Sequence, residues 1–283
     1  MAIRIVTDSA SDIPQTQAKA WDITVLPLII RFGDEEYLDG VTLAPERFFT
    51  LLENGREFPK TSQITPYAYS LAFGDAVRHG DDVVCLCMSS GVSGSYQSAC
   101  YAAAEAGEHV FVIDTRQFCI SEYILVERAV QLRDAGFTAA ELVSIILSEL
   151  DRVHVMAAFD TLEYLRMGGR LSGAAATVGG LLNIKPILTI TDGVVDVLGK
   201  TRGIRKACEA LVAEIRKLGE IDFSMPVRFG YTGRTDEAMR QFVECFRAHF
   251  AWPEDAPAAG AEAGVTAQPG AAAEPGAAVG AQT

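Results

Sequence analysis

Apolar residues in the first half of the chain follow two alternating patterns. Short continuous apolar runs predict buried strands, which are Ile3–Thr7, Thr24–Phe32, Val83–Met88 and Val110–Asp114. Stretches with apolar positions three and four residues apart predict helices, which are Pro14–Trp21, Pro45–Asn54, Pro66–Val77, Ser95–Ala106, Ser121–Ala135 and Thr138–Leu150. Continuous apolar strands are typical of parallel sheets whose two faces are both covered. We therefore predict an α/β domain over residues 1–151, with a parallel sheet flanked by helices.

The pattern changes in the second half, where the strands are no longer separated by regular helices. The predicted strands are Val153–Phe159, Pro186–Thr191, Val194–Leu198 and Met225–Gly230, and the predicted helices are Ile204–Leu218 and Thr235–His249. Asp192-Gly193 predicts a tight turn between the second and third of these strands. We predict a second α/β domain of mixed topology over residues 152–253.

The last 30 residues, 254–283, have a different composition from the rest. They include 12 Ala, 5 Gly and 3 Pro, and they contain no aromatic residue and no Lys or Arg. Such a segment buries too little apolar surface to offset the entropy lost on ordering. We therefore expect a disordered tail.

Composition and charge exclude several classes of partner. Of 283 residues, 49% are hydrophobic and 22% charged, and the formal net charge is −13. The chain lacks the basic surface with which binding to nucleic acids and anionic membranes begins. No apolar run approaches the ~20 residues that span a bilayer, and the N-terminus lacks the pattern of a signal peptide. We expect a cytoplasmic protein with no nucleic-acid partner, no stable membrane insertion and reduced cysteines.

Two of the six cysteines, Cys85 and Cys87, lie two residues apart in a predicted strand, so both side chains point to one face. This spacing could begin a metal site. Small buried apolar residues are the favoured interpretation, because no second Cys or His pair has the spacing of metal ligands. We expect no metal and no cofactor.

The densest polar cluster is Ser89–Ala99, with the sequence SSGVSGSYQSA, which follows a buried strand and opens a helix. The carboxyl end of such a strand is where open α/β sheets bind ligands, and free N–H groups at a helix N-terminus favour an anion. A simple helix cap, with Ser93 or Ser95 as N-cap, is the alternative. Neither GxxxxGK[ST] nor GxGxxG is present, and Gly91-Val-Ser-Gly94 is not a GxSxG nucleophile elbow. The cluster therefore predicts an anionic head group rather than a nucleotide or an acyl-enzyme.

A second hydroxyl cluster lies at Lys60–Pro66, where Thr65 is expected to cap the following helix. That role leaves Thr61, Ser62 and Gln63 unexplained. Asp8, after the first strand, is expected to organise neighbouring loops by accepting backbone hydrogen bonds rather than to act as a catalytic acid.

Six segments carry these residues in the order found in one protein family. They are Thr7-Asp8-Ser9, Thr61-Ser62-Gln63, Ser90–Ala99, Gly168–Ser172, Leu182–Leu188 and Lys200–Ala207. In this order, from Ile3 to His249, the chain resembles the DegV family of fatty-acid-binding proteins, which act as acyl carriers for bacterial fatty acid kinase. The resemblance implies two α/β domains with one long-chain fatty acid in the cleft between them. It also implies a carrier without enzymatic activity and a role in phospholipid metabolism.

The resemblance also implies roles for individual residues. Thr61 and Ser93 match the family's contacts to the fatty-acid carboxylate, with Ser62 and the backbone of the Ser90–Gly94 loop nearby. Arg170 is expected to pair with a loop carboxylate rather than with the ligand.

The only basic cluster comprises Lys200, Arg202, Arg205 and Lys206, which we expect at the start of the Ile204–Leu218 helix. Positive charges there oppose the helix dipole. The family's kinase-docking region matches this cluster, and Arg202 matches the arginine that the kinase recognises. A solvated helix end without a partner is the alternative.

The sequence departs from the family at its C-terminal end. Family members have a His-x-Gly-x-Gly segment whose histidine also binds the carboxylate, but Ala272 and Ala273 stand where that histidine would fall. Tyr231, which follows a predicted strand, is a candidate replacement donor. Two functional alternatives stay open beside the carrier. One is an enzyme that uses the Ser90–Ser95 loop on a small phosphorylated substrate, and the other is a lipid-binding protein that has lost transfer.

Overall fold

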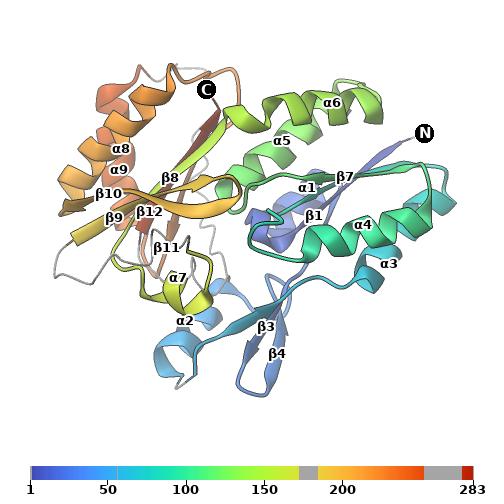
Figure 1. Ribbon diagram of the computed structural model, residues 1–283, viewed down its shortest axis with the longest axis horizontal. Coiled ribbons are helices and arrows are strands. Elements are labelled where there is room, and N and C mark those ends of the chain that lie inside the picture. The colour runs from blue at the N-terminus through green and yellow to red at the C-terminus, as the bar shows by residue number, and fades with distance from the viewer. Residues whose placement is uncertain (1, 56, 172–183, 252–275, 283) are drawn as a thin grey trace.

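The computed structural model describes residues 2–55, 57–171, 184–251 and 276–282 (Figure 1). Its first sheet is parallel, in the order β2-β1-β6-β7. The strands are β1 (Ile3–Asp8), β2 (Ile23–Leu26), β6 (Asp82–Cys87) and β7 (Val110–Asp114). The flanking helices are α1 (Gln15–Ala20), α3 (Pro66–Arg78), α4 (Ser95–Ala106), α5 (Ile120–Asp134) and α6 (Ala139–Glu149). Two short 3-10 turns, η1 (Ser9–Ser11) and η2 (Leu150–Arg152), follow β1 and α6.

Side chains of the central strands alternate between two cores. In β6, Val84 and Leu86 pack in the core that includes α5 and α6, whereas Val83, Cys85 and Cys87 pack in the core that includes α3 and α4. This alternation confirms the predicted parallel sheet with both faces covered. It also confirms that Cys85 and Cys87 are small buried residues, since both side chains are fully buried.

A small antiparallel sheet projects from this domain, in the order β4-β3-β5. It consists of β3 (Ile29–Phe32), β4 (Glu35–Leu38) and β5 (Lys60–Ser62), and α2 (Pro45–Asn54) accompanies it. The single predicted strand Thr24–Phe32 is therefore wrong, because the chain divides into β2 and β3 at Pro27. Proline lacks the N–H that a central strand must donate. Ile30, Phe48 and Phe49 lie in the core of this module.

The second sheet has the order β10-β9-β8-β12-β11, with antiparallel pairing throughout. Its strands are β8 (Val153–Phe159), β9 (Ile184–Thr191), β10 (Val194–Arg202), β11 (Val227–Thr232) and β12 (Gly276–Gln282). Two long helices, α8 (Ile204–Leu218) and α9 (Glu237–His249), cover one face, and α7 (Glu163–Gly168) follows β8 (Figure 1). Leu188 of β9 and Val195 of β10 pack in the core shared with α3 and α4, so the two predicted domains share a core.

The expectation of a disordered tail over 254–283 is wrong for residues 276–282. They form β12, which pairs with β8 on one side and β11 on the other. A strand with neighbours on both edges is stabilised by its backbone hydrogen bonds, which an Ala- and Gly-rich composition does not reveal. Residues 252–275 lie outside the described residues.

The expectation of reduced cysteines is wrong for one pair. Cys208 of α8 and Cys245 of α9 form a disulfide, while Cys85, Cys87, Cys100 and Cys119 are free. The two helices pack side by side, which brings the Cα atoms of Cys208 and Cys245 to 6.5 Å, within reach of a disulfide. A sequence separation of 37 residues gives no sign of this proximity. In the described part of the chain, no helix has both the length and the apolar character needed to cross a bilayer.

Candidate ligand-binding site

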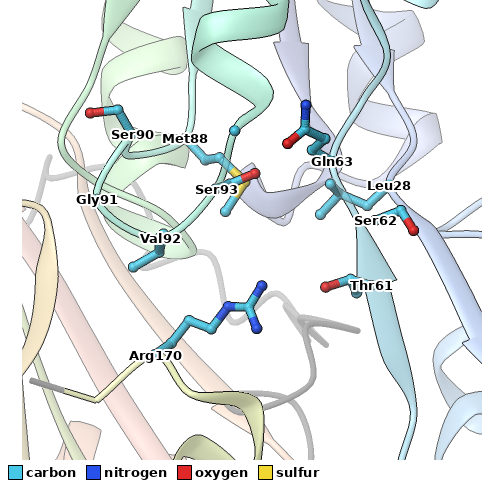
Figure 2. A pocket seen from close by; sticks show the side chains of 11 residues that line it. Leu28, Thr61, Ser62, Gln63, Met88, Ser90, Gly91, Val92, Ser93 and Arg170 are labelled. Atoms are coloured by element: carbon cyan, nitrogen blue, oxygen red, sulfur yellow. The ribbon is translucent and has the colours of Figure 1, made fainter.

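A cavity of about 400 Å³ opens where β5, the β6–α4 loop and the segment after α7 meet. Its lining residues are Leu28, Thr61, Ser62, Gln63, Met88, Ser90, Gly91, Val92, Ser93, Gly94 and Arg170 (Figure 2). The volume falls within the range of small-molecule sites. Five residues expected to surround a head group thus lie together, although 27 residues lie between Ser62 and Ser90 in the sequence; the five are Thr61, Ser62, Ser90, Ser93 and Gly94.

The β6–α4 loop is held by the turn between β9 and β10. The Ser89 hydroxyl donates to the Gly193 carbonyl oxygen at 2.7 Å. A Cβ added at Gly91 would lie 2.9 Å from that oxygen, and one added at Gly193 would lie 2.3 Å from the Ser89 hydroxyl oxygen. Both glycines are therefore needed for the close approach, and Gly193 also has a positive φ of 78°.

The two hydroxyl clusters are joined by hydrogen bonds. The Ile64 N–H donates to the Ser95 hydroxyl oxygen at 3.2 Å, and the Ser93 and Ser95 hydroxyl oxygens are 3.0 Å apart. Gln63 Nε2 donates to the Ser98 hydroxyl oxygen at 3.0 Å, and its Oε1 lies so close to Gly94 that a Cβ there would be 2.0 Å away. The separation of the two clusters is thus fixed by contacts on both sides.

The helix-cap alternative explains only part of this arrangement. The N-cap residue of α4 is Gly94, not Ser93 or Ser95, and it makes no side-chain cap. The Ser95 N–H does donate to the Ser93 hydroxyl oxygen at 3.2 Å, which satisfies one of the free donors at the helix start. Thr65, in contrast, caps α3 as expected by accepting from the Ala68 N–H.

Ser90 lines the cavity but directs its hydroxyl elsewhere. Its hydroxyl and its N–H both donate to the carboxylate of Asp114, at the end of β7. In Figure 2 the Ser90 hydroxyl points away from Ser93 and Thr61. Ser90 therefore shapes the loop and does not direct its hydroxyl into the cavity.

Asp8 organises the loops beneath the cavity, as expected. Its carboxylate accepts from the N–H of Ala10 at 3.0 Å and from the N–H of Met88 at 2.8 Å. Burial raises the pKa of Asp8 to about 7, against the lowering effect of these two hydrogen bonds. The role predicted for Asp8, organising loops through backbone hydrogen bonds, is confirmed.

Asp39 holds Leu28, another residue of the cavity lining, in a similar way. It accepts from the Ser9 hydroxyl at 2.7 Å, and that hydroxyl accepts from the N–H of Leu28 at 3.0 Å. Burial, with a smaller contribution from the nearby Asp8 carboxylate, raises the pKa of Asp39 to about 7 against the lowering effect of the Ser9 hydrogen bond. Two cavity-lining residues, Met88 and Leu28, are therefore held by buried carboxylates.

Arg170 does not pair with a loop carboxylate among the described residues, in contrast to the expectation from sequence. Figure 2 shows its guanidinium pointing into the cavity, toward the space between Thr61 and Ser93. It donates to the Gly168 carbonyl oxygen, and it takes part in none of the ion pairs among the described residues. Gly169 ends α7 with a φ of 70°, so the Gly168-Gly169 pair was the available signal that the chain turns here.

The expected position of the basic cluster is partly wrong. Lys200 and Arg202 belong to β10, which extends to Arg202, and only Arg205 and Lys206 lie in α8. A bulge at Leu198 shifts the register, so that Lys200 pairs with Pro186 and Arg202 with Ile184. These partners share the face of Leu188, which packs away from α8. The exposed side chain of Arg205 pairs with Glu209 at 3.4 Å.

Tyr231 is not brought to the cavity. It lies in β11, is half-buried, and packs against the core that includes Phe229 beneath α8 and α9. Ala272 and Ala273, at the expected histidine position, lie outside the described residues. Among the described residues, no group of three or more His, Cys, Asp or Glu side chains is arranged to hold a metal ion.

Comparison with known proteins identifies the family. The family model described as "Uncharacterised protein, DegV family" matches residues 2–273. The chain belongs to the DegV family. Among DegV relatives, a DegV domain-containing protein of Caldanaerobacter subterraneus is 38% identical over 223 residues, covering 78% of this chain and 79% of the relative. A DegV domain-containing protein of Deinococcus radiodurans is 37% identical over 217 residues, covering 77% of each chain.

Solved structures share the fold over the whole chain. One is described as fatty acid binding of a DegV family protein from Thermus thermophilus; it is 28% identical, covers 100% of both chains and has a TM-score of 0.85. Another, a stearic acid-binding protein from Eubacterium ventriosum, is 25% identical, covers 100% of this chain and 98% of its own, and has a TM-score of 0.86. The mixed α/β fold of this DegV chain is therefore the fold of proteins that bind fatty acids.

Proposed function

We propose that this DegV chain binds a long-chain fatty acid with its carboxylate in the cavity between β5 and the β6–α4 loop. The observation that carries the proposal is the convergence of the Thr61 and Ser93 hydroxyls on one small cavity at the start of α4. Hydroxyl and N–H donors at a helix N-terminus suit a carboxylate. Fatty acid binding by the similar proteins from Thermus thermophilus and Eubacterium ventriosum supports this ligand class.

The remaining head-group contacts follow from the lining. The Ser62 hydroxyl and the backbone at Gly94 lie beside the two principal donors, and the Arg170 guanidinium supplies positive charge from the second domain. The acyl tail extends from the apolar wall at Leu28, Met88 and Val92 toward the core shared by the two domains. An apolar enclosure with a few polar groups at one end is the usual composition of such sites.

In the same proposal the protein is a cytoplasmic carrier and forms no covalent bond itself. A separate fatty acid kinase transfers the terminal phosphoryl group of ATP to the bound carboxylate, giving an acyl phosphate for phospholipid metabolism and ADP. Lys200 and Arg202 are exposed on β10, and with Arg205 they form the docking surface for that kinase. Lys200 and Arg202 share one face of the second sheet because of the bulge at Leu198, and this shared face supports their common role in docking.

Mass spectrometry of the denatured protein after organic extraction tests the ligand. Release of a C14–C18 fatty acid is expected. A released phosphorylated metabolite would instead support the enzyme that uses the Ser90–Ser95 loop. Protein that carries no acid and fails to bind added palmitate or oleate would refute the proposal. If acid is bound but a cognate kinase transfers no phosphoryl group, the chain is a lipid-binding protein without transfer.

A further inference from the structure

The hydrogen-bond chain that ends at Ser93 can be assigned hydrogen by hydrogen. The Ile64 N–H donates to the Ser95 hydroxyl oxygen, and the Ser95 N–H donates to the Ser93 hydroxyl oxygen, each at 3.2 Å. The two hydroxyl oxygens are 3.0 Å apart, so one of them donates to the other. Each hydroxyl has a single hydrogen and two acceptor lone pairs.

Burial decides the direction of that bond. The Ser95 side chain is fully buried, and the Ser93 oxygen is the only acceptor that its hydrogen meets among the described residues. If Ser93 donated instead, the Ser95 hydrogen would be buried without an acceptor, which is unfavourable. Ser95 therefore donates to Ser93. With both lone pairs of Ser93 occupied by Ser95, the Ser93 hydrogen is left for the cavity that Ser93 lines.

We propose that Ser95 is a positioning residue that commits the Ser93 hydroxyl to donation into the cavity. The inference rests on the proposed function, because it takes a fatty-acid carboxylate as the occupant. A carboxylate accepts hydrogen bonds and has no hydrogen to give, whereas an alcohol can do both. A serine held as a donor therefore selects the ionised acid over a neutral amphiphile of the same chain length. A serine free to rotate would discriminate less.

The experiment compares oleate with oleyl alcohol as probes. For each variant, the measured quantity is the ratio of the two dissociation constants, alcohol over oleate. Ser95→Ala frees the Ser93 hydroxyl and is expected to lower this ratio about fivefold to tenfold, the scale of a charge-assisted hydrogen bond. Ser95→Thr keeps the hydroxyl and is expected to restore the ratio.

Ser98→Ala is the matched control. Ser98 is also a buried serine of α4, but its hydroxyl accepts from Gln63 and, among the described residues, forms no hydrogen bond with Ser93. If Ser95 contributed only to stability, Ser95→Ala would lower the affinities for oleate and oleyl alcohol together and leave their ratio unchanged. If Ser95→Ala does not fold, as judged by thermal melting, Ser95→Cys decides, because its thiol is a weak donor and should give an intermediate ratio.

Three results would overturn the inference: an unchanged ratio in the Ser95 variants, an equal fall in Ser98→Ala, or no restoration by Ser95→Thr. These are distinct from failure of the proposed function. In that case the wild-type protein binds neither probe.

Discussion

The two walls of the cavity are built in different ways. The first-domain wall carries Thr61 and Ser93, whose segments are joined by hydrogen bonds through Ile64, Ser95 and Gln63. The second-domain wall carries Arg170, which reaches the cavity from the turn after α7. The first wall fixes where the hydroxyl groups stand, and the second brings a positive charge to the same cavity.

The largest effect is expected from removing the strand that completes the second sheet. A chain ending at Pro253 lacks β12, which leaves β8 and β11 without their shared neighbour. Each lost backbone hydrogen bond costs ~1 kcal/mol, so the melting temperature should fall by about 10 °C or more. Oleate binding should be lost as well. Differential scanning calorimetry and ligand titration measure both.

A point variant separates the strand from the preceding residues. Val279→Pro removes a donor in the middle of β12, where Val279 lies between Phe229 and Met156. It should lower the melting temperature in the same direction. A truncated chain that melts like the full chain and keeps its fatty acid would show that β12 does not support the second wall.

A second large effect concerns pH and the first wall. Asp8 and Asp39 have pKa values raised to about 7 by burial, above the 3.8 of an exposed carboxyl. The folded state therefore binds more protons than the unfolded state between about pH 4 and pH 7. Stability is highest below this window and falls as pH rises through it, by a few kcal/mol. Urea unfolding at several pH values measures this slope.

Asp39→Asn should flatten that slope, because the amide keeps a hydrogen-bond acceptor for Ser9 without acquiring charge. An exposed carboxylate, Asp134, provides the matched control as Asp134→Asn. A slope that is equally steep in wild type and Asp39→Asn would mean that Asp39 does not titrate in this range.

Ser93→Ala tests the fixed donor. The variant removes a hydroxyl whose oxygen is hydrogen-bonded to both the N–H and the hydroxyl of Ser95. Oleate binding should weaken by about 2 kcal/mol, the cost of losing a hydrogen bond to a charged group. Isothermal titration with oleate measures the change, and circular dichroism should show an intact fold. If Ser93→Ala bound oleate as tightly as the wild-type protein, the carboxylate would have to bind elsewhere.

Thr61→Ala tests the less constrained donor and should have a smaller effect. The Thr61 hydroxyl has no hydrogen-bond partner among the described residues, so it must lose rotational freedom when it binds. Its removal should weaken oleate binding by about 1 kcal/mol. A loss larger than that of Ser93→Ala would reverse the proposed order of the two donors. Thr61→Ser is the control that keeps the hydroxyl.

The smallest effect on binding is expected at the docking surface. Arg202→Ala should leave oleate affinity unchanged, because Arg202 does not line the cavity. It should reduce phosphoryl transfer by a cognate kinase, since a docking residue acts on the encounter. Turnover is followed over a range of carrier concentrations. Transfer equal to wild type at every concentration would argue against docking at this strand.

Much of the fold could be predicted from local patterns. The helices Pro45–Asn54 and Ser95–Ala106 and the strand Val153–Phe159 have the predicted bounds, because each combines a clear period with a Pro or Gly near its start or a continuous apolar run. The strand β12 could not be predicted, because its order depends on two neighbours more than 40 residues away in sequence. The same limit applies to the disulfide between α8 and α9.

The candidate site was predictable where residues of one chemical type cluster in the sequence. It was not predictable where the direction of a single side chain depends on the fold. Clustered hydroxyls predicted an anionic head group, and the resemblance to the DegV family pointed to Thr61 and Ser93, both of which line the cavity. Arg170 was expected to pair with a loop carboxylate, but its guanidinium points into the cavity. The sequence could not show this, because a single arginine gives no information on the direction of its side chain. Tyr231 was a candidate donor by position after a strand, but strand alternation turns it toward the core beneath α8 and α9.

The length of the β9–β10 hairpin sets the distance between the loop that lines the cavity and Arg202. Its turn touches the head-group loop, where the Ser89 hydroxyl meets Gly193, and its far end carries Arg202. Nine residues of extended strand separate these points, a span of about 30 Å. Under the proposed function, a kinase that binds Arg202 must extend along this whole span to reach the fatty-acid carboxylate. The hairpin thus sets the minimum length of the surface that the kinase must cover. Changing the length of the hairpin by two residues would move the docking residue and leave the cavity unchanged.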